Sequence, residues 1–230
     1  MIGARLVKTS GILLVAGGLG LAVMNVLTAL AFPGDTAAQA KEALWTPAFV
    51  LVAVSTMMLL FGAPVLYSRL AGPGGPMAQV GLILVAIVGM ALGVFGNLQQ
   101  ALVLPWVASE APSMLSSSAP SPVTFTVFFI VSGVVEVLGL ISLSVPLLRG
   151  RLGSRWPGGA LALAAVLGLL GFVVSPGSSM SGNVGLSLLS AAPAVLLAIF
   201  FMEMGRRMMS EPAIELRAAS GEPAPSMPRY

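Results

Sequence analysis

The stretch FFIVSGVVEVLGLISL, residues Phe128 to Leu143, is apolar almost throughout and yet carries one carboxylate, Glu136. It lies inside a longer apolar run, 122–148. A helix needs about 20 apolar residues to cross about 30 Å of hydrocarbon, so this run predicts a transmembrane helix. A carboxylate near the middle of such a helix is costly, which makes Glu136 the first residue to explain.

The composition of the whole chain agrees with this stretch. Of its 230 residues, 57% are hydrophobic and only 8% are charged, whereas soluble domains carry about 25% charged residues. The polar side chains are too few to cover a surface that faces water. The composition therefore predicts an integral membrane protein of the all-α class.

The apolar segments predict a bundle of six transmembrane helices within residues 1–205. The approximate spans are 10–32, 46–67, 78–104, 122–148, 158–175 and 184–205. Residues 206–230 mix both signs of charge with proline and glycine near the end. They predict a short cytoplasmic tail without stable structure.

The basic residues predict the orientation. Lysine and arginine collect in cytoplasmic loops. With the N-terminus inside, the outer loops hold only Lys41. The cytoplasmic segments then hold Arg5, Lys8, Arg69, Arg149, Arg151, Arg155, Arg206, Arg207, Arg217 and Arg229. Both termini are therefore expected in the cytoplasm, with the basic side chains against anionic lipid headgroups of the plasma membrane.

The N-terminal region allows a second interpretation, a cleaved secretory signal. ARLVK precedes an apolar run, and the small residues of Ala38-Gln39-Ala40 follow it. The run from Gly11 to Phe32 has 22 residues, longer than the roughly 7–15 of a signal core. We expect the first helix to be retained; cleavage would leave five helices in the same orientation.

A weak internal repeat connects the second and fourth spans. The second ends in PVLYSRL (Pro64–Leu70) and the fourth in PLLRGRL (Pro146–Leu152), and both match P-x-L-x-x-R-L. A turn containing Pro-Gly-Gly and another apolar helix follow each copy. The pattern favours a parallel duplication of a helix pair over an inverted one.

Most intramembrane chemistry requires residues that this sequence lacks. It contains neither cysteine nor histidine, which are the usual zinc, haem and redox ligands. Its single aspartate, Asp35, lies in an outer loop, and Lys8 and Lys41 lie at opposite faces of the membrane. No enzymatic activity, cofactor or metal site is expected, and no basic stretch interleaved with aromatic residues predicts nucleic-acid binding.

Small and amide-bearing residues recur at helical spacing in three spans. They are Gly18, Ala22, Asn25 and Ala29 in the first, Gly89, Gly93, Asn97 and Gln100 in the third, and Ser187, Ala191, Ala194 and Ala198 in the sixth. Such faces allow close helix packing, within the chain or against a protein partner or second copy. The same residues also fit a polar cavity in the outer half of the membrane. Packing is the favoured interpretation.

Glu136 has no lysine or arginine at its depth, so its carboxyl is expected to be neutral. Ser132, Gly133 and Gly139 lie one turn away, on a small-residue face that should point into the bundle, and Ser55 or Thr56 could reach it. The acid either donates a hydrogen bond between helices or binds a proton or cation. By contrast, Glu203 precedes Arg206 and Arg207 at helical spacing, which predicts an ion pair at the membrane interface.

Two functions remain open from the sequence. The first is an accessory or lipid-interacting membrane component without enzymatic activity. The alternative is a small transporter or transporter subunit, with Glu136 as its proton or cation site. The candidate polar site comprises Glu136, Asn25, Asn97, Gln100 and Ser132. The observation that separates the two functions is whether the acid and the amides line one cavity or are sealed by packing.

Overall fold

Every element of the chain is helical in the part that the computed structural model describes. The described residues are 4–32, 36–72, 74–115, 123–150, 155–174 and 184–220. The main helices are α1 (Ala4–Ala31), α3 (Trp45–Leu70), α4 (Gly75–Val88), α5 (Asn97–Glu110), α6 (Val123–Leu148), α7 (Trp156–Val174) and α8 (Val184–Ser220). The short elements are α2 (Thr36–Gln39), the π-helix η1 (Gly89–Gly96) and the 3₁₀ helix η2 (Pro112–Leu115). The all-α class is confirmed.

Five of the described helices are long and apolar enough to cross a membrane. They are Ala4–Ala31, Trp45–Leu70, Gly75–Glu110, Thr126–Leu148 and Val184–Ser210. The expected fifth span, 158–175, corresponds to α7, whose apolar part Trp156–Gly171 is shorter than these five. The chain is thus a multi-pass membrane protein with five helices of spanning length and one shorter apolar helix among its described residues.

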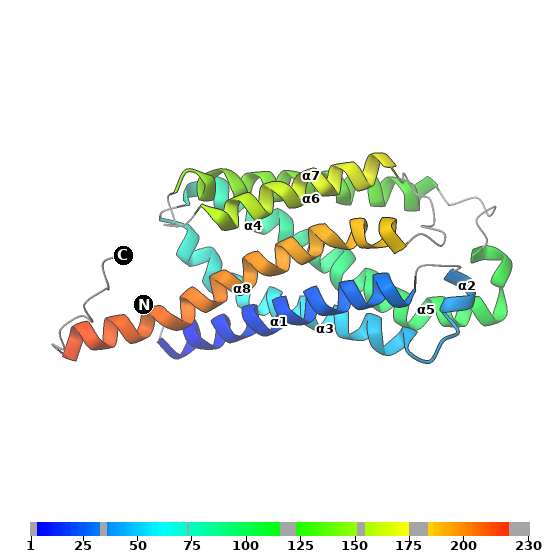
Figure 1. Cartoon of the computed structure of the whole chain (residues 1–230), viewed down its shortest axis with the longest axis horizontal. Coiled ribbons are helices and arrows are strands. Elements are labelled where there is room, and N and C mark those ends of the chain that lie inside the picture. The colour runs from blue at the N-terminus through cyan, green and yellow to red at the C-terminus, as the bar shows by residue number, and fades with distance from the viewer. Residues whose placement is uncertain are drawn as a thin grey trace.

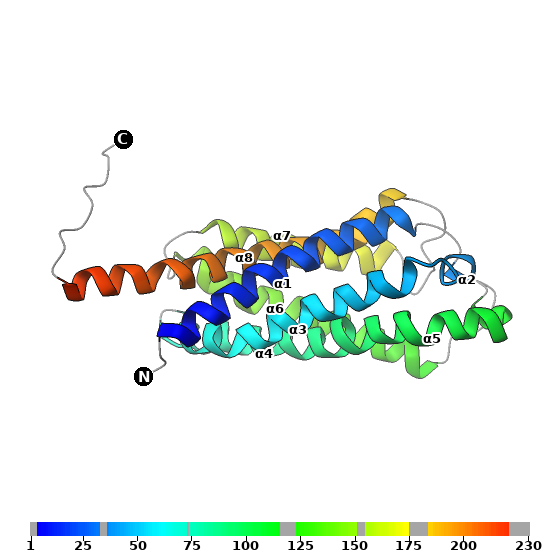
Figure 2. The same ribbon diagram turned by 90° about the horizontal axis from the view of Figure 1, so that it is seen from below.

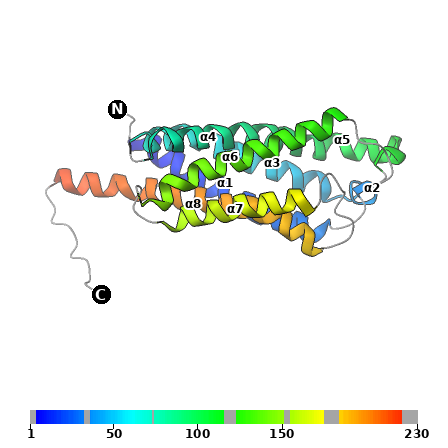
Figure 3. The same cartoon turned by 90° about the horizontal axis from the view of Figure 1, so that it is seen from above.

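The contacts between the long helices close into a ring, and Figures 1 and 3 show these helices running alongside one another. α1 packs against α3 on one side and α8 on the other, and α7 packs against α8 and α6. α6 packs against α4, which continues through η1 into α5, and η1 and α5 pack against α3. Because each long helix has two neighbours, the centre of the bundle is surrounded on all sides.

The start of α1 and the end of α8 lie at the same end of the bundle (Figures 1 and 2). This end, called the basic end below, also receives the end of α3, the end of α6 and the start of α7. Its described basic residues are Arg5, Lys8, Arg69, Arg149, Arg155, Arg206 and Arg207. The opposite end, called the acidic end, carries Lys41, Glu42 and Glu110. Charge therefore divides between the two ends as the sequence suggests.

α1 and α8 approach each other at a pair of glycines. A Cβ on Gly11 would lie 2.8 Å from the Gly205 carbonyl oxygen, and one on Gly205 would lie 2.5 Å from the Gly11 carbonyl oxygen. Only glycine permits such backbone contact. Ala198 of the predicted sixth-span face is also fully buried. At these positions the small residues are used for packing inside the chain.

The third span is longer than expected and irregular. Residues Gly75–Glu110 form one continuous helix of 36 residues, where the sequence indicated 78–104. Its middle, Gly89–Gly96, is π-helical over 8 residues. π-Helical turns are rare and often occur at functional sites, because they displace the residues that follow them. The first residue after this segment is Asn97.

The C-terminal helix is longer than the sequence predicts. α8 continues to Ser220, beyond residue 205, where the helical domain was expected to end, and 221–230 lie outside the described residues.

The two copies of the internal repeat are only partly described. Pro64 and Pro146 both lie inside helices that end at the basic end. Arg151 and Leu152 of the second repeat copy lie outside the described residues, so the duplication stays a prediction.

Candidate functional site

A cavity of about 200 Å³ lies at the centre of the ring. Its lining comes from α1, α3, α4, η1, α5, α6 and α8, and most of the wall is aliphatic. The polar side chains that line this central cavity are Asn25, Thr56, Asn97 and Glu136. Three candidate residues from different helices, Glu136, Asn25 and Asn97, thus meet at one site.

Glu136 occupies the middle of α6. At 1.5 Å per residue, its Cα lies about 20 Å from the start of the helix and about 18 Å from the end. No described residue forms a hydrogen bond or an ion pair with its carboxyl. Glu136 also borders a smaller cavity of about 90 Å³ on the side of α7, lined in part by Gly168 and Pro193. Its carboxyl therefore meets empty space instead of a partner on another helix.

The two asparagines use their amide nitrogens on their own helices. Asn25 Nδ2 donates to the Leu21 carbonyl oxygen at 2.8 Å. Asn97 Nδ2 donates to the carbonyl oxygens of Gly93 at 2.9 Å and Leu92 at 3.2 Å. A carbonyl oxygen only accepts, so the nitrogen of each amide must face the backbone. The side-chain oxygens of both residues remain free of any described donor.

The π-helix explains why Asn97 has two backbone partners. Its Leu92 acceptor lies five residues earlier and its Gly93 acceptor four residues earlier. In a π-helix the backbone bonds shift toward the fifth residue, which loosens the usual ladder. The Asn97 amide satisfies carbonyl groups at the end of this irregular segment. The orientation of the Asn97 side chain therefore depends on the π-helical turns that precede it.

Thr56 completes the polar part of the wall. Its Oγ1 donates to the Val52 carbonyl oxygen at 3.0 Å, and its methyl group lies against η1, where a Cβ on Gly93 would be 2.7 Å from Thr56 Cγ2. The close approach of Gly93 thus brings Thr56 and Asn97 to the same cavity. Ser55, the other residue expected near Glu136, contacts Gly20 of α1 instead.

A second, more open cavity of about 310 Å³ lies toward the acidic end and is called the outer vestibule here. Its polar lining includes Thr28, Gln39, Gln100, Ser187 and Ser190, and its aromatic lining is Phe32, Trp45 and Phe49. Asn25 lines both the outer vestibule and the central cavity. This residue therefore marks where the two spaces adjoin.

Trp45 links the start of α3 to α5 beside this vestibule. Its Nε1 donates to the Gln100 carbonyl oxygen at 2.7 Å, and its ring lies 4.5 Å from that of Phe49 and 5.1 Å from that of Phe32, centroid to centroid. Trp45 is buried, with 4% of its surface exposed. This aromatic cluster holds one wall of the vestibule in place.

The five predicted site residues are thus divided among three places. Glu136, Asn25 and Asn97 line the central cavity, while Gln100 lines the outer vestibule. Ser132 is buried on α6, one turn before Glu136, and is not part of either wall. Thr56 belongs to the cavity although it was only a possible neighbour of Glu136. The sequence signal for Thr56 is Gly93. Once α3 and η1 are known to be adjacent, a glycine at position 93 marks where Thr56 can approach η1.

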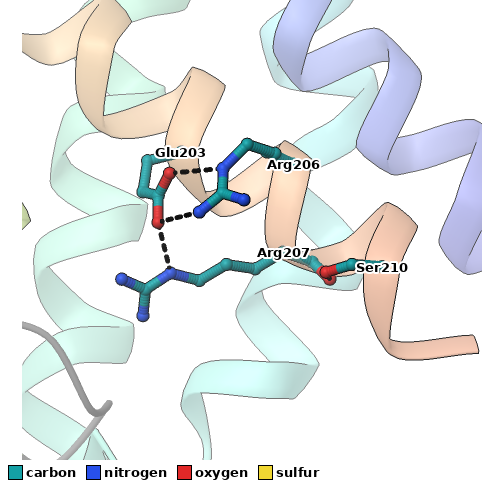
Figure 4. Close-up of polar contacts among 4 residues, drawn as sticks. All are labelled: Glu203, Arg206, Arg207 and Ser210. Atoms are coloured by element: carbon teal, nitrogen blue, oxygen red, sulfur yellow. Dashed lines mark hydrogen bonds and ion pairs between the residues drawn. The ribbon is translucent and has the colours of Figure 1, made fainter. Parts of the chain in front are cut away.

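Glu203 has a different environment from Glu136. Its carboxylate binds Arg206 Nε at 2.9 Å and Arg207 Nε at 2.7 Å (Figure 4). Ser210 Oγ donates to the Arg207 carbonyl oxygen at 2.9 Å. The predicted ion pair at helical spacing is confirmed. This acid is neutralised within its own helix at the basic end and takes no part in the central cavity.

Within the part of the chain that the structure describes, no group of three or more His, Cys, Asp or Glu side chains is arranged to hold a metal ion. The central cavity combines one carboxyl with the neutral oxygens of Asn25, Thr56 and Asn97 in an aliphatic wall.

Comparison with protein-family models, with curated proteins and with solved structures finds no match for this chain. Functional assignment therefore depends on the chemistry of the cavity.

Proposed function

We propose that this chain is a small transporter or transporter subunit of the plasma membrane, without enzymatic activity, in which Glu136 binds a proton or a cation. The observation that carries the proposal is the shared cavity of Glu136, Asn25 and Asn97. An acid that only joined helices would hydrogen-bond to a neighbouring helix, because an unpaired buried polar group is costly. Glu136 has no such partner among the described residues, which favours binding over packing.

The adjoining vestibule supports a route to the site from one side of the membrane. Asn25 lines both spaces, and the vestibule carries polar groups from α1, α5 and α8. A polar, open space can hold water, whereas an apolar one stays dry. The acid at the membrane centre is therefore reached through the outer vestibule. An accessory component that only bound lipid would have no need for this path.

We propose six membrane crossings with both termini in the cytoplasm. An even number of crossings is supported by the common end of α1 and α8 (Figure 1). This requires α7 to cross, with its 19 residues covering about 28 Å, close to the hydrocarbon thickness. The basic end then faces the cytoplasm, in keeping with the preference of arginine and lysine for that side. Anionic headgroups there are the expected lipid partners.

Cysteine accessibility tests this proposal, because the chain has no cysteine of its own. Asn25→Cys and Asn97→Cys place a thiol in the central cavity. Ala53→Cys, at a position on α3 with 0% exposure, is the control in a packed wall. If the chain is a transporter, a charged, water-soluble thiol reagent should modify both cavity thiols from either face of the membrane. Intact cells expose the outer face to the reagent, and inverted vesicles expose the cytoplasmic face.

The outcomes separate the two functions left open by the sequence. Modification from both sides, with the Ala53→Cys thiol unreactive, supports alternating access. A cavity thiol that reacts with the reagent from neither side would show that the cavity is sealed, and the accessory function would then replace the transporter. Thermal unfolding of each variant in detergent verifies that reactivity reports access and not loss of the fold.

A further inference from the structure

We infer that the central cavity selects a small primary ammonium ion with an apolar body and exchanges it for the proton of Glu136. This inference rests on the proposed transport function and adds the substrate class to it.

The hydrogen-bonding groups that the cavity offers to a ligand are mainly acceptors. The amide nitrogens of Asn25 and Asn97 and the hydroxyl of Thr56 all donate to backbone carbonyls of their own helices. Both N–H bonds of Asn97 and the O–H of Thr56 are used in this way, so these two groups offer a ligand only their oxygens, which accept. Asn25 offers its oxygen and keeps one N–H of its amide. Together with the Glu136 carboxylate, the wall presents acceptors from four helical segments. A ligand that matches this wall must carry several donors.

A primary ammonium group has that property. It carries three N–H donors and no acceptor. A quaternary ammonium ion has the same charge but no N–H, so it leaves the three neutral oxygens unused. An alcohol carries one donor and no charge. The wall therefore distinguishes an ammonium from its quaternary and neutral analogues of similar shape.

Charge sets the valence of the ligand. Glu136 is the single titratable residue among those that line the cavity. α4 and α7, which pack against α6, and η1 contain no Asp, Glu, Lys, Arg or Tyr. The nearest ionised residue along α8 is Glu203, which is bound to Arg206 and Arg207. In α1, α3 and α5 the charged residues are at the helix ends.

Net charge is costly inside the membrane, so the occupied site should be neutral. One proton on Glu136 gives a neutral site, and one monovalent cation beside its carboxylate does the same. A divalent cation leaves an excess positive charge, and an anion leaves an excess negative one. The cavity therefore accommodates a single positive charge at a time.

Size and wall chemistry define the rest of the ligand. The cavity volume is about 200 Å³, compared with about 150 Å³ for an apolar cavity that binds benzene. Leu59, Leu82, Val85 and Phe201 contribute to its wall. A bare sodium ion would leave this apolar surface in contact with water or empty. A ring or chain of about six carbons attached to the ammonium group fills it.

The exchange step conserves charge and breaks one O–H bond. The ammonium ion enters with its three protons, the Glu136 O–H bond breaks, and that proton leaves to water through the outer vestibule. The carboxylate that remains pairs with the ammonium group. One positive charge enters and one leaves, so binding releases one proton per ligand, and the release requires Glu136.

Calorimetric titration of the purified full-length protein in nanodiscs tests this exchange, with cyclohexylammonium as the probe. Titrations near neutral pH in two buffers of different ionisation enthalpy count the protons released. The amine is fully charged there, since its ammonium group is comparable with that of lysine. We expect one proton released per amine bound. Cyclohexanol and N,N,N-trimethylcyclohexylammonium should bind about 10- to 100-fold more weakly, the effect of hydrogen bonds to a charged group.

Variants connect the binding to the residues. Glu136→Gln should abolish both amine binding and proton release, and Asn97→Leu should weaken binding about tenfold through loss of one acceptor. Glu42→Gln, which neutralises an exposed acid at the acidic end, is the matched control and should bind as the unaltered protein does. The comparison of the three ligands on the unaltered protein does not depend on any variant folding.

Each outcome decides a different claim. Equal binding of cyclohexanol and cyclohexylammonium, or amine binding without proton release, overturns the inference. If no amine binds while the cavity thiols react from both sides, the substrate class is wrong and the transport proposal stands. If the cavity thiols are also inert, both fail. Amine binding with one proton released, lost in Glu136→Gln and kept in Glu42→Gln, supports the exchange.

Discussion

Glu136 at the middle of α6 and Asn97 at the start of α5 line the same central cavity. The Asn97 amide nitrogen is held by two backbone carbonyls at the end of a π-helix, which leaves its oxygen as a free acceptor. The Glu136 carboxyl is without a described partner. An acid and an oriented amide that share a cavity but not a hydrogen bond leave room for a third group.

The contact between Gly93 and Thr56 sets the distance between η1 and α3. We predict that Gly93→Ala destabilises the protein by about 1–3 kcal/mol through overpacking, since its Cβ would lie 2.7 Å from Thr56 Cγ2. Gly96→Ala is the matched control in the same π-helix, because its Cβ meets nothing closer than the Ala91 carbonyl oxygen at 3.6 Å. Thermal unfolding in detergent measures both variants.

A second substitution identifies the cause of that effect. Thr56→Ser removes the methyl group and keeps the hydroxyl, so in the Gly93→Ala background it should restore part of the lost stability. Additive effects of the two substitutions would mean that Gly93 is needed for the π-helical backbone itself and not for the approach of Thr56.

Replacement of Glu136 by leucine shows whether this carboxyl stabilises the fold or binds a ligand. Glu136 has no described partner to strand, so Glu136→Leu should change the free energy of unfolding by less than about 1 kcal/mol while abolishing ligand binding. Functional residues are often dispensable for stability in this way. A loss of about 1–3 kcal/mol, with Glu136→Gln tolerated, would instead identify the acid as a hydrogen-bond donor between helices.

Glu203, unlike Glu136, should be dispensable for ligand binding. Arg206 is largely exposed, with 68% of its side chain accessible, so its ion pair is screened by solvent. We expect Glu203→Gln to lower stability by less than about 1 kcal/mol, by an amount that shrinks as salt is added. Amine binding should be unchanged. Impaired binding in this variant would extend the functional site to the basic end.

The position of α7 can be tested with two single cysteines. Ser154 precedes α7 and Ser179 follows it. If α7 crosses the membrane, an impermeant thiol reagent added to intact cells modifies Ser179→Cys and leaves Ser154→Cys unmodified. Labelling of neither site from outside would place both ends of α7 in the cytoplasm and reduce the number of crossings to five.

The sequence predicted the helical class and the five long apolar helices, because hydropathy is a local property. It singled out Glu136 for the same kind of reason, since the cost of an acid in an apolar helix is also local. It could also suggest that Asn25 and Asn97 lie in the outer half of the membrane. It could not place Gln100 in a separate vestibule, since the order of helices around the ring depends on contacts between distant segments. The π-helix at Gly89–Gly96 was also beyond prediction, because its glycines equally fit a regular helix.

Small residues illustrate the same limit. The glycine and alanine faces were expected to pack, and Gly18 and Gly93 of those faces do contact neighbouring helices. The amides on those faces were grouped with the packing residues, yet the oxygens of Asn25 and Asn97 have no described hydrogen-bond donor. Spacing shows which residues share a helix face, but not whether that face meets a helix or a cavity.

Binding of a proton or an ammonium ion at Glu136 is measured most directly by the infrared signal of its carboxyl, isolated by subtracting the spectrum of Glu136→Gln. We expect this signal to convert from the protonated to the carboxylate form as the pH is raised while the protein stays folded. Cyclohexylammonium should produce the same conversion at fixed pH. A protonated signal that responds to neither pH nor amine would rule out proton and ammonium binding at Glu136 and make it a structural residue.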